Sequence, residues 1–199
     1  MISAEVFRGQ PVLTGERVRL EPMGIEHFDG IWPMMSEPES TRLTGTHRRF
    51  TEGGVRNWLA TRKDHHDRAD WAIVRREDGE VLGEAVLDEL DPHNGSAAYR
   101  ISLVGPKVFG RGFGTEATRL VVDYAFDVAG LHRVSLEVFD FNPRAQRVYE
   151  KCGFVREGVQ REALLWEGRR HDAITMAVLA TDPRGKSTVD QSEAVGDPA

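Results

Sequence analysis

Three glycines at alternate positions in the middle of the chain constrain its fold more than any other feature. They are Gly110, Gly112 and Gly114, and a strand-like run at 97–104 leads into them. From Thr115 to Ala129, apolar residues recur at the spacing of one helix face. A strand, a glycine loop and the start of a helix form an anion site, because free N–H groups converge there and the helix dipole favours negative charge. The sequence therefore predicts a phosphate held by backbone amides at 110–115.

Composition limits the classes of protein to which the chain can belong. Its 199 residues are 40% hydrophobic and 29% charged, which is typical of a globular domain. The formal net charge of −6 argues against a nucleic-acid partner, which needs a basic face. Cys152 is the only cysteine, so no disulfide forms within the chain and we expect a reducing cytoplasm. Apolar runs are too short for a membrane span and the N-terminus lacks a signal-peptide pattern, so we expect no membrane.

Hydrophobic periodicity predicts an α+β order of elements. Strands are expected at 13–22, 71–74, 81–87, 97–104, 134–138, 153–155 and 172–179. Helices are expected at 25–35, 51–67, 115–129 and 142–152, a long loop at 36–50 and a turn at 169–171. This order predicts an α/β/α sandwich with a mixed, mostly antiparallel sheet of about seven strands and a single β-α-β crossover.

One domain is expected, at residues 12–181. Residues 1–11 are interpreted as a loose lead-in. Residues 182–199 are rich in Pro, Gly and polar side chains, and we expect a disordered tail there. The sequence leaves open whether the protein is a monomer or a homodimer.

Two other phosphate motifs fit the sequence less well. The dinucleotide fingerprint G-x-G-x-x-G fails because Thr115 stands where its third glycine belongs, and because the loop lies in mid-chain. Gly185-Lys186-Ser187 resembles the end of a P-loop, but Ala180 replaces the first glycine and no helix is expected after it. A nucleotide-binding protein therefore ranks third among the functional hypotheses.

Three segments carry a more specific pattern: Val104–Ala117, Asn142–Phe154 and Leu13–Leu20. The first resembles the pyrophosphate loop of the GCN5-related N-acetyltransferase (GNAT) superfamily, and the second resembles that family's second motif. The third resembles the opening strand of the branch that acetylates ribosomal-protein N-termini. The resemblance covers residues 12–180. It departs at Phe109, where many relatives have Gln or Arg, and at Ala145, where relatives often have Ser or Thr.

The resemblance implies an enzyme that moves acetyl from its co-substrate acetyl-CoA to a primary amine by direct attack, without a metal. Pantetheine is expected to pair with the strand that ends at Leu103 and Val104, with a free Val104 N–H polarising the thioester carbonyl. Tyr149 is expected to protonate the CoA thiolate, because a phenol is mostly protonated at pH 7. The expected cofactor residues are Leu103, Val104, Phe109, Gly110, Arg111, Gly112, Phe113, Gly114, Thr115 and Asn142.

Alternative roles stay open for several of these residues. Tyr149 shares a helix face with Cys152 and also fits a core tyrosine, while Asn142 also fits an N-cap. No general base can be identified from the sequence. Deprotonation at pH 7 costs about 4.6 kcal/mol for a lysine amine but about 1.1 kcal/mol for an α-amine. Glu84 and Glu137 are the acids expected to face the cleft, although each also fits an ordinary strand carboxylate.

The acceptor is expected to bind between residues 32–50 and 156–172. Either a protein N-terminus or a small-molecule amine fits this expectation. Another donor such as succinyl-CoA is an alternative, since Arg48 and Arg49 could meet a carboxylate, although the pattern better fits two solvated arginines. A non-catalytic CoA-binding regulatory module is the alternative from another functional class.

Overall fold

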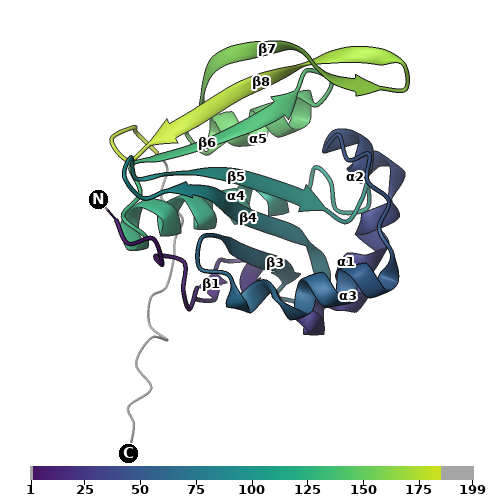
Figure 1. Cartoon of the computed structure of the whole chain (residues 1–199), viewed down its shortest axis with the longest axis horizontal. Helices are drawn as coiled ribbons and strands as arrows, with labels where there is room; N and C mark the ends of the chain where they lie inside the picture. The colour runs from purple at the N-terminus through teal and green to yellow at the C-terminus, as the bar shows by residue number, and fades with distance from the viewer. Residues whose placement is uncertain (1, 185–199) are drawn as a thin grey trace, which may run out of the picture.

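An eight-stranded sheet forms the centre of the computed structural model, which describes residues 2–184 (Figure 1). The strands are β1 (Leu13–Thr14), β2 (Val18–Pro22), β3 (Ala69–Arg75), β4 (Val81–Asp91), β5 (Ser96–Leu103), β6 (Arg133–Phe139), β7 (Val155–Trp166) and β8 (Arg169–Leu179). They lie in the order β1-β2-β3-β4-β5-β6-β8-β7. The β5–β6 pair is parallel and its neighbours are antiparallel, so the sheet is mixed, as expected.

Helices cover both faces of this sheet. They are α1 (Phe28–Ile31), α2 (Pro38–Leu43), α3 (Glu52–Ala60), α4 (Phe113–Asp123) and α5 (Pro143–Lys151), with short 3₁₀ turns η1 (Ile25–His27), η2 (Trp32–Ser36) and η3 (Arg62–Asp64) and a π-helical turn η4 (Tyr124–Val128). Helices α4 and α5 lie behind the sheet in Figure 1, with α1 and α3 in front of it. Within residues 2–184, no helix is both long and apolar enough to cross a membrane.

The alternation of side chains along β3 shows how the two layers are held. Trp71 and Ile73 pack into the larger core with α4, while Ala72 and Val74 pack into a second core with α1 and α3. All four side chains are buried, because both faces of this central strand are covered. The apolar residues of β3 therefore bind the two helix layers to one sheet.

The sheet has eight strands rather than about seven, because the expected first strand is divided. A tight turn, closed by the Gly15 N–H and the Val18 carbonyl at 2.9 Å, separates β1 from β2. The carboxylate of Glu116 in α4 accepts hydrogen bonds from the Arg17 and Val18 amides at 2.8 and 3.2 Å. A side chain distant in the sequence thus holds this turn.

The expected long loop at 36–50 and the expected turn at 169–171 were wrong in part. Residues 38–43 form α2, which begins with Pro38 and is capped by the Glu37 carboxylate, an acceptor for the Ser40 N–H at 2.6 Å. Residues 169–171 belong to β8, and the turn lies at Glu167 and Gly168. The short polar helix lacks the apolar periodicity by which helices are recognised.

The end of the described chain contacts the domain. The Asp182 carboxylate accepts from the Leu179 N–H at 2.9 Å, and Arg184 pairs with Asp127 at 2.7 Å and with Asp123 at 3.5 Å. Asp182 and Arg184, which were expected to lie at the start of the tail, therefore have defined partners. The rest of that tail, including Gly185-Lys186-Ser187, lies outside the described residues.

Strands β5 and β6 separate soon after they meet. Their pairing covers Ser96–Ala98 against Arg133–Ser135, after which β5 stays with β4 and β6 with β8. Figure 1 shows the two strands moving apart toward α2. The β6-facing edge of β5 is therefore left without a strand partner from Tyr99 onward.

Candidate functional site

A cavity of about 1490 Å³ lies where β5 and β6 separate. Residues from both faces of the sheet line it. Tyr149 and the glycine loop belong to the α4–α5 side, and Glu84 and Ser102 to the opposite side. A site for one small ligand usually has about 300–1,000 Å³. The volume is therefore large enough for two reactants that approach each other from opposite faces.

The glycine loop has the backbone geometry that an anion site requires. Gly110 and Gly112 have φ values of 71° and 88°, which favour glycine. Gly112 is the N-cap of α4, and the Glu116 N–H closes the first turn on the Gly112 carbonyl at 3.1 Å. The amides of Phe113, Gly114 and Thr115 precede that bond and have no acceptor within the helix. These amides can donate hydrogen bonds to a phosphate at the positive end of α4.

Arginine side chains stack on the two aromatic residues of this loop. Arg17 lies 4.4 Å from the Phe113 ring and donates to the Arg111 carbonyl at 2.8 Å. Arg111 lies 5.2 Å from the same ring. On α5, Arg144 lies 4.2 Å from the Phe109 ring and lines the cavity. Positive charge thus collects at the end of the cavity where the free amides lie.

The strand edge differs from expectation at Val104. Its N–H donates to the Leu82 carbonyl at 2.8 Å, so the free amide expected there is absent. Alternate residues of an antiparallel strand direct their amides to opposite sides. The N–H of Leu103 therefore faces the open edge, while the Leu103 carbonyl accepts from Ser40 Oγ at 2.8 Å. Leu103, which lines the cavity, thus replaces Val104 as the candidate donor at the end of β5.

Helix α5 carries Asn142 and Tyr149. Asn142 Oδ1 accepts from the Ala145 N–H at 3.1 Å, so Asn142 is the N-cap, and it also lines the cavity. Tyr149 is 7% exposed and packs against the rings of Tyr99 and Phe154. Burial raises the pKa of Tyr149, so its phenol stays protonated. Within residues 2–184 its hydroxyl has no hydrogen-bond partner, whereas that of Tyr99 bonds to Thr118 at 3.0 Å.

Glu84 is the notable acid on the other face. It lies opposite Ser102 in the β4–β5 ladder, and its Oε2 is wholly buried with no partner among the described residues. Burial raises the pKa of Glu84, and the charge of Arg100 offsets part of this effect. The other candidate, Glu137, is exposed and hydrogen-bonded to the Gln160 side chain. Glu84 is therefore the better placed proton acceptor.

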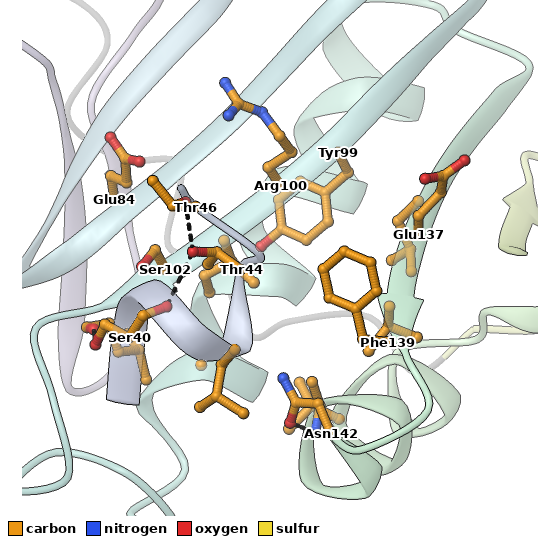
Figure 2. Close-up of a pocket in the computed structure, with 18 of the residues that line it drawn as sticks. Ser40, Thr44, Thr46, Glu84, Tyr99, Arg100, Ser102, Glu137, Phe139 and Asn142 are labelled. Atoms are coloured by element: carbon orange, nitrogen blue, oxygen red, sulfur yellow. Dashed lines mark hydrogen bonds between the residues drawn. The ribbon is translucent and has the colours of Figure 1, made fainter. Parts of the chain in front are cut away.

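Residues 44–50 close this face of the cavity. Thr44 Oγ1 bonds to the Ser40 carbonyl at 2.9 Å and to Thr46 Oγ1 at 2.8 Å, and Figure 2 shows these hydroxyls around the same space as Glu84 and Ser102. The His47 ring stacks on Trp166 of β7 with 5.0 Å between centroids. From the expected acceptor range 156–172, only Glu157 lines the cavity among the described residues, so that half of the expectation was largely wrong.

Residues 17–155 match the family model of the acetyltransferase (GNAT) domain. The chain belongs to this family of acetyltransferases. This GNAT chain is 44% identical over 140 residues to the probable N-acetyltransferase YjcK of Bacillus subtilis. The aligned residues cover 70% of this chain and 74% of YjcK. The chain is also 33% identical over 118 residues to the spermidine N(1)-acetyltransferase of Vibrio cholerae. The aligned residues cover 59% of this chain and 68% of that enzyme.

A solved structure supports the fold of this GNAT chain. The spermidine N-acetyltransferase from Vibrio cholerae, in complex with CoA and spermine, aligns with a TM-score of 0.76 and 22% identity. The alignment covers 82% of this chain and 96% of that protein. The GNAT fold expected from the three sequence segments is thus confirmed, with one strand more than expected.

Several residues of this GNAT site were not found from the sequence. Arg17 reaches the glycine loop from a turn far earlier in the chain, and no local pattern shows this contact. Arg144, Arg147 and Lys151 all line the cavity, and their spacing of three and four residues on α5 is a signal that predicts one basic helix face. Cys152 is buried with its pKa raised to about 12, as expected for a packing residue.

Within residues 2–184, no three His, Cys, Asp or Glu side chains are grouped as a metal site requires. His65 bonds to Arg62 at 3.0 Å on the surface, and its neighbour His66 is not part of such a group.

Proposed function

We propose that this GNAT protein transfers acetyl from acetyl-CoA to a primary amine by direct attack. The observation that carries the proposal is the cavity between β5 and β6, which joins the free amides of the glycine loop to the unpartnered carboxylate of Glu84. The relative solved with both CoA and spermine supports a site of this fold for two reactants.

The residues of the cavity fit the parts of acetyl-CoA. The amides at 113–115 and the side chains of Arg144, Arg147 and Lys151 suit its phosphates. The unpaired edge of β5 offers backbone groups to the amide-bearing pantetheine arm, as it would to an added strand. Asn142 keeps its side-chain amide nitrogen for this arm while its oxygen caps α5. No metal is needed for any of these contacts.

Each proton and bond in the transfer has a named group. Glu84 accepts a proton from the ammonium of the acceptor, and the free amine then attacks the thioester carbon. The Leu103 N–H stabilises the charge on the thioester oxygen. A C–N bond forms, the C–S bond breaks, and Tyr149 gives its phenolic proton to the departing thiolate. The attacking nitrogen then loses its second proton, which restores the Tyr149 phenol, and Glu84 releases the first proton to solvent. The products are an N-acetyl amide and CoA.

Two classes of acceptor fit this chemistry. The similarity to spermidine N(1)-acetyltransferase favours a small-molecule amine. The resemblance of Leu13–Leu20 to the ribosomal-protein branch favours a protein N-terminus, whose α-amine loses its proton at lower cost. A buried carboxylate such as Glu84 is of greater use to an alkyl amine, which holds its proton more tightly. We therefore propose a small-molecule amine first and an N-terminus second. A cytoplasmic location stays a prediction.

The test is CoA release with a panel of amines, followed with a thiol reagent. The panel contains alkyl amines, polyamines, amino acids and peptides with free N-termini, with acetyl-CoA or succinyl-CoA as donor. We expect amine-dependent CoA release from acetyl-CoA. Thermal stabilisation by acetyl-CoA without turnover of any amine would indicate a CoA-binding module instead. Stabilisation by NAD or ATP but not by CoA would favour a nucleotide-binding protein, and release from succinyl-CoA alone would change the donor.

A further inference from the structure

Some of the charged side chains that line the cavity on the Glu84 side of the sheet form ion pairs, and others do not. Asp88 contacts Arg100 at 3.0 Å and Arg68 at 3.8 Å. Glu157 binds Arg133 through both carboxylate oxygens, at 2.7 and 2.5 Å. Asp88 of β4 and Glu157 of β7 therefore neutralise arginines of the protein itself, and these two acids are not free to bind a cation.

Arg48 and Arg49 also line this cavity, and they differ from the paired arginines. Among the described residues neither has a carboxylate partner, and Arg48 only lies over the Phe50 ring at 5.4 Å. Two adjacent guanidinium groups without a counter-charge at the mouth of a cavity suit an anionic group of a ligand. Arginine binds carboxylates through paired hydrogen bonds, which makes a carboxylate the best fit.

The segment that carries these two arginines is anchored at both ends. On one side His47 stacks on Trp166 of β7. On the other side Phe50 packs against the core formed by α1, α3 and β3, which Val104 at the end of β5 also contacts. The two arginines therefore lie between two packed aromatic contacts, and they line the same cavity as Glu84.

We propose that the acceptor is an amine that carries a carboxylate, with Arg48 and Arg49 binding the carboxylate while the amine reaches Glu84. This inference rests on the proposed acetyl transfer. It separates this chain from polyamine acetylation, because a polyamine has several ammonium groups and needs a free carboxylate for each. Among the described acids that line the cavity, Glu84, the exposed Glu89 and Glu137 form no ion pair with an arginine, and Glu137 is already hydrogen-bonded to Gln160.

The test compares acceptors that differ only in the carboxylate. One pair is 4-aminobutyrate and 4-aminobutanamide, and another is the peptide amides Ala-Asp-Ala and Ala-Asn-Ala, with spermidine as the polyamine. We expect kcat/KM to be about tenfold higher for the carboxylate in at least one pair. The preference should fall as salt rises from low to physiological concentration, because the arginines are exposed.

Variants identify the residues responsible. The double variant Arg48→Glu with Arg49→Glu should lose the preference for the carboxylate. Arg161→Glu is the matched control, because Arg161 is exposed, has no ion-pair partner among the described residues and does not line the cavity. The control should keep the preference, and circular dichroism should show that both variants fold.

Three results would overturn this inference alone. Equal turnover within both pairs, or a preference for spermidine, would do so while leaving acetyl transfer intact. The inference would also fail if the double variant lost activity only with succinyl-CoA, because the arginines would then bind the acyl donor rather than the acceptor. If no amine in the panel releases CoA, the proposed acetyl transfer itself fails, and the inference fails with it.

Discussion

Ser40 Oγ donates a hydrogen bond to the Leu103 carbonyl at 2.8 Å and so ties α2 to the end of β5. This bond fixes the acceptor-side helix to the strand along which the cofactor arm is expected to lie. It also gives a hydrogen-bond donor to the Leu103 carbonyl oxygen, which faces the open edge of β5 and has no partner in a neighbouring strand. The position of the Leu103 N–H, the proposed donor to the thioester, therefore depends on a residue of α2.

Ser40→Ala should lower the free energy of unfolding by about 1–2 kcal/mol, because Ser40 is buried and the Leu103 carbonyl loses its partner. We also expect kcat to fall several-fold, which is measured with saturating acetyl-CoA. Thr61→Ala removes a comparable hydrogen bond to the Trp58 carbonyl, away from β5, and serves as the control. Equal kinetics for the two variants would show that α2 does not position Leu103.

Gly110→Ala should raise KM for acetyl-CoA. A Cβ at Gly110 meets no protein atom within 4 Å, so it would project into the space that the phosphates are expected to occupy. Gly79, in the β3–β4 turn, has nearly the same φ, 77° against 71°, and an equally open Cβ position. Both substitutions should therefore cost about 1–2 kcal/mol of stability through backbone strain. Only Gly110→Ala should weaken cofactor binding, and equal KM values would contradict the assigned phosphate site.

Glu84→Gln should change the pH dependence of both activity and stability. Burial raises the pKa of Glu84, so the folded state holds this proton to higher pH than the unfolded state does. Stability is then lost as pH rises from the unfolded pKa through the folded one. The Gln variant should be more stable than the wild type at pH 7 and similar to it at pH 3, as measured by urea denaturation.

The same variant should lose activity. With Glu84 as the base, kcat/KM of the wild type falls as pH drops through the raised pKa, and this acidic limb should be absent from Glu84→Gln. We expect the variant to be about a hundredfold slower with an alkyl amine and less impaired with an α-amine, which is easier to deprotonate. Glu137→Gln is the control, because the Glu137 carboxylate already accepts a hydrogen bond from Gln160. An unchanged acidic limb in Glu84→Gln would remove Glu84 from the mechanism.

The sequence predicted the local features of the site and missed those set by distant contacts. The glycine loop and α5 could be predicted because their signals lie within a few residues of one another. Helix α2 could not, because its stability depends on the Glu37 cap and on Ser40 contacting a strand 63 residues away. A Glu-Pro pair before a polar run was the one local sign of that helix.

The strand edge shows a different limit. Periodicity predicted the strand that ends near Val104, but which amides face the opening depends on the pairing of β4 with β5. That pairing gives the Val104 N–H to Leu82 and leaves Leu103 at the open side. The sheet likewise gained a strand because the Glu116 carboxylate holds the turn between β1 and β2. Such partners are fixed by tertiary structure rather than by local pattern.

The central claim is that Tyr149 acts on acetyl-CoA within the cavity, and one comparison tests it most directly. Tyr149→Phe and Tyr124→Phe each remove the hydroxyl of a buried tyrosine, but Tyr124 packs against Trp71 and does not line the cavity. Both affinity for acetyl-CoA, from calorimetry, and kcat for the best amine are measured. We predict a kcat about a hundredfold lower for Tyr149→Phe, with acetyl-CoA affinity intact and Tyr124→Phe close to the wild type. A Tyr149→Phe enzyme with wild-type kcat would contradict the account.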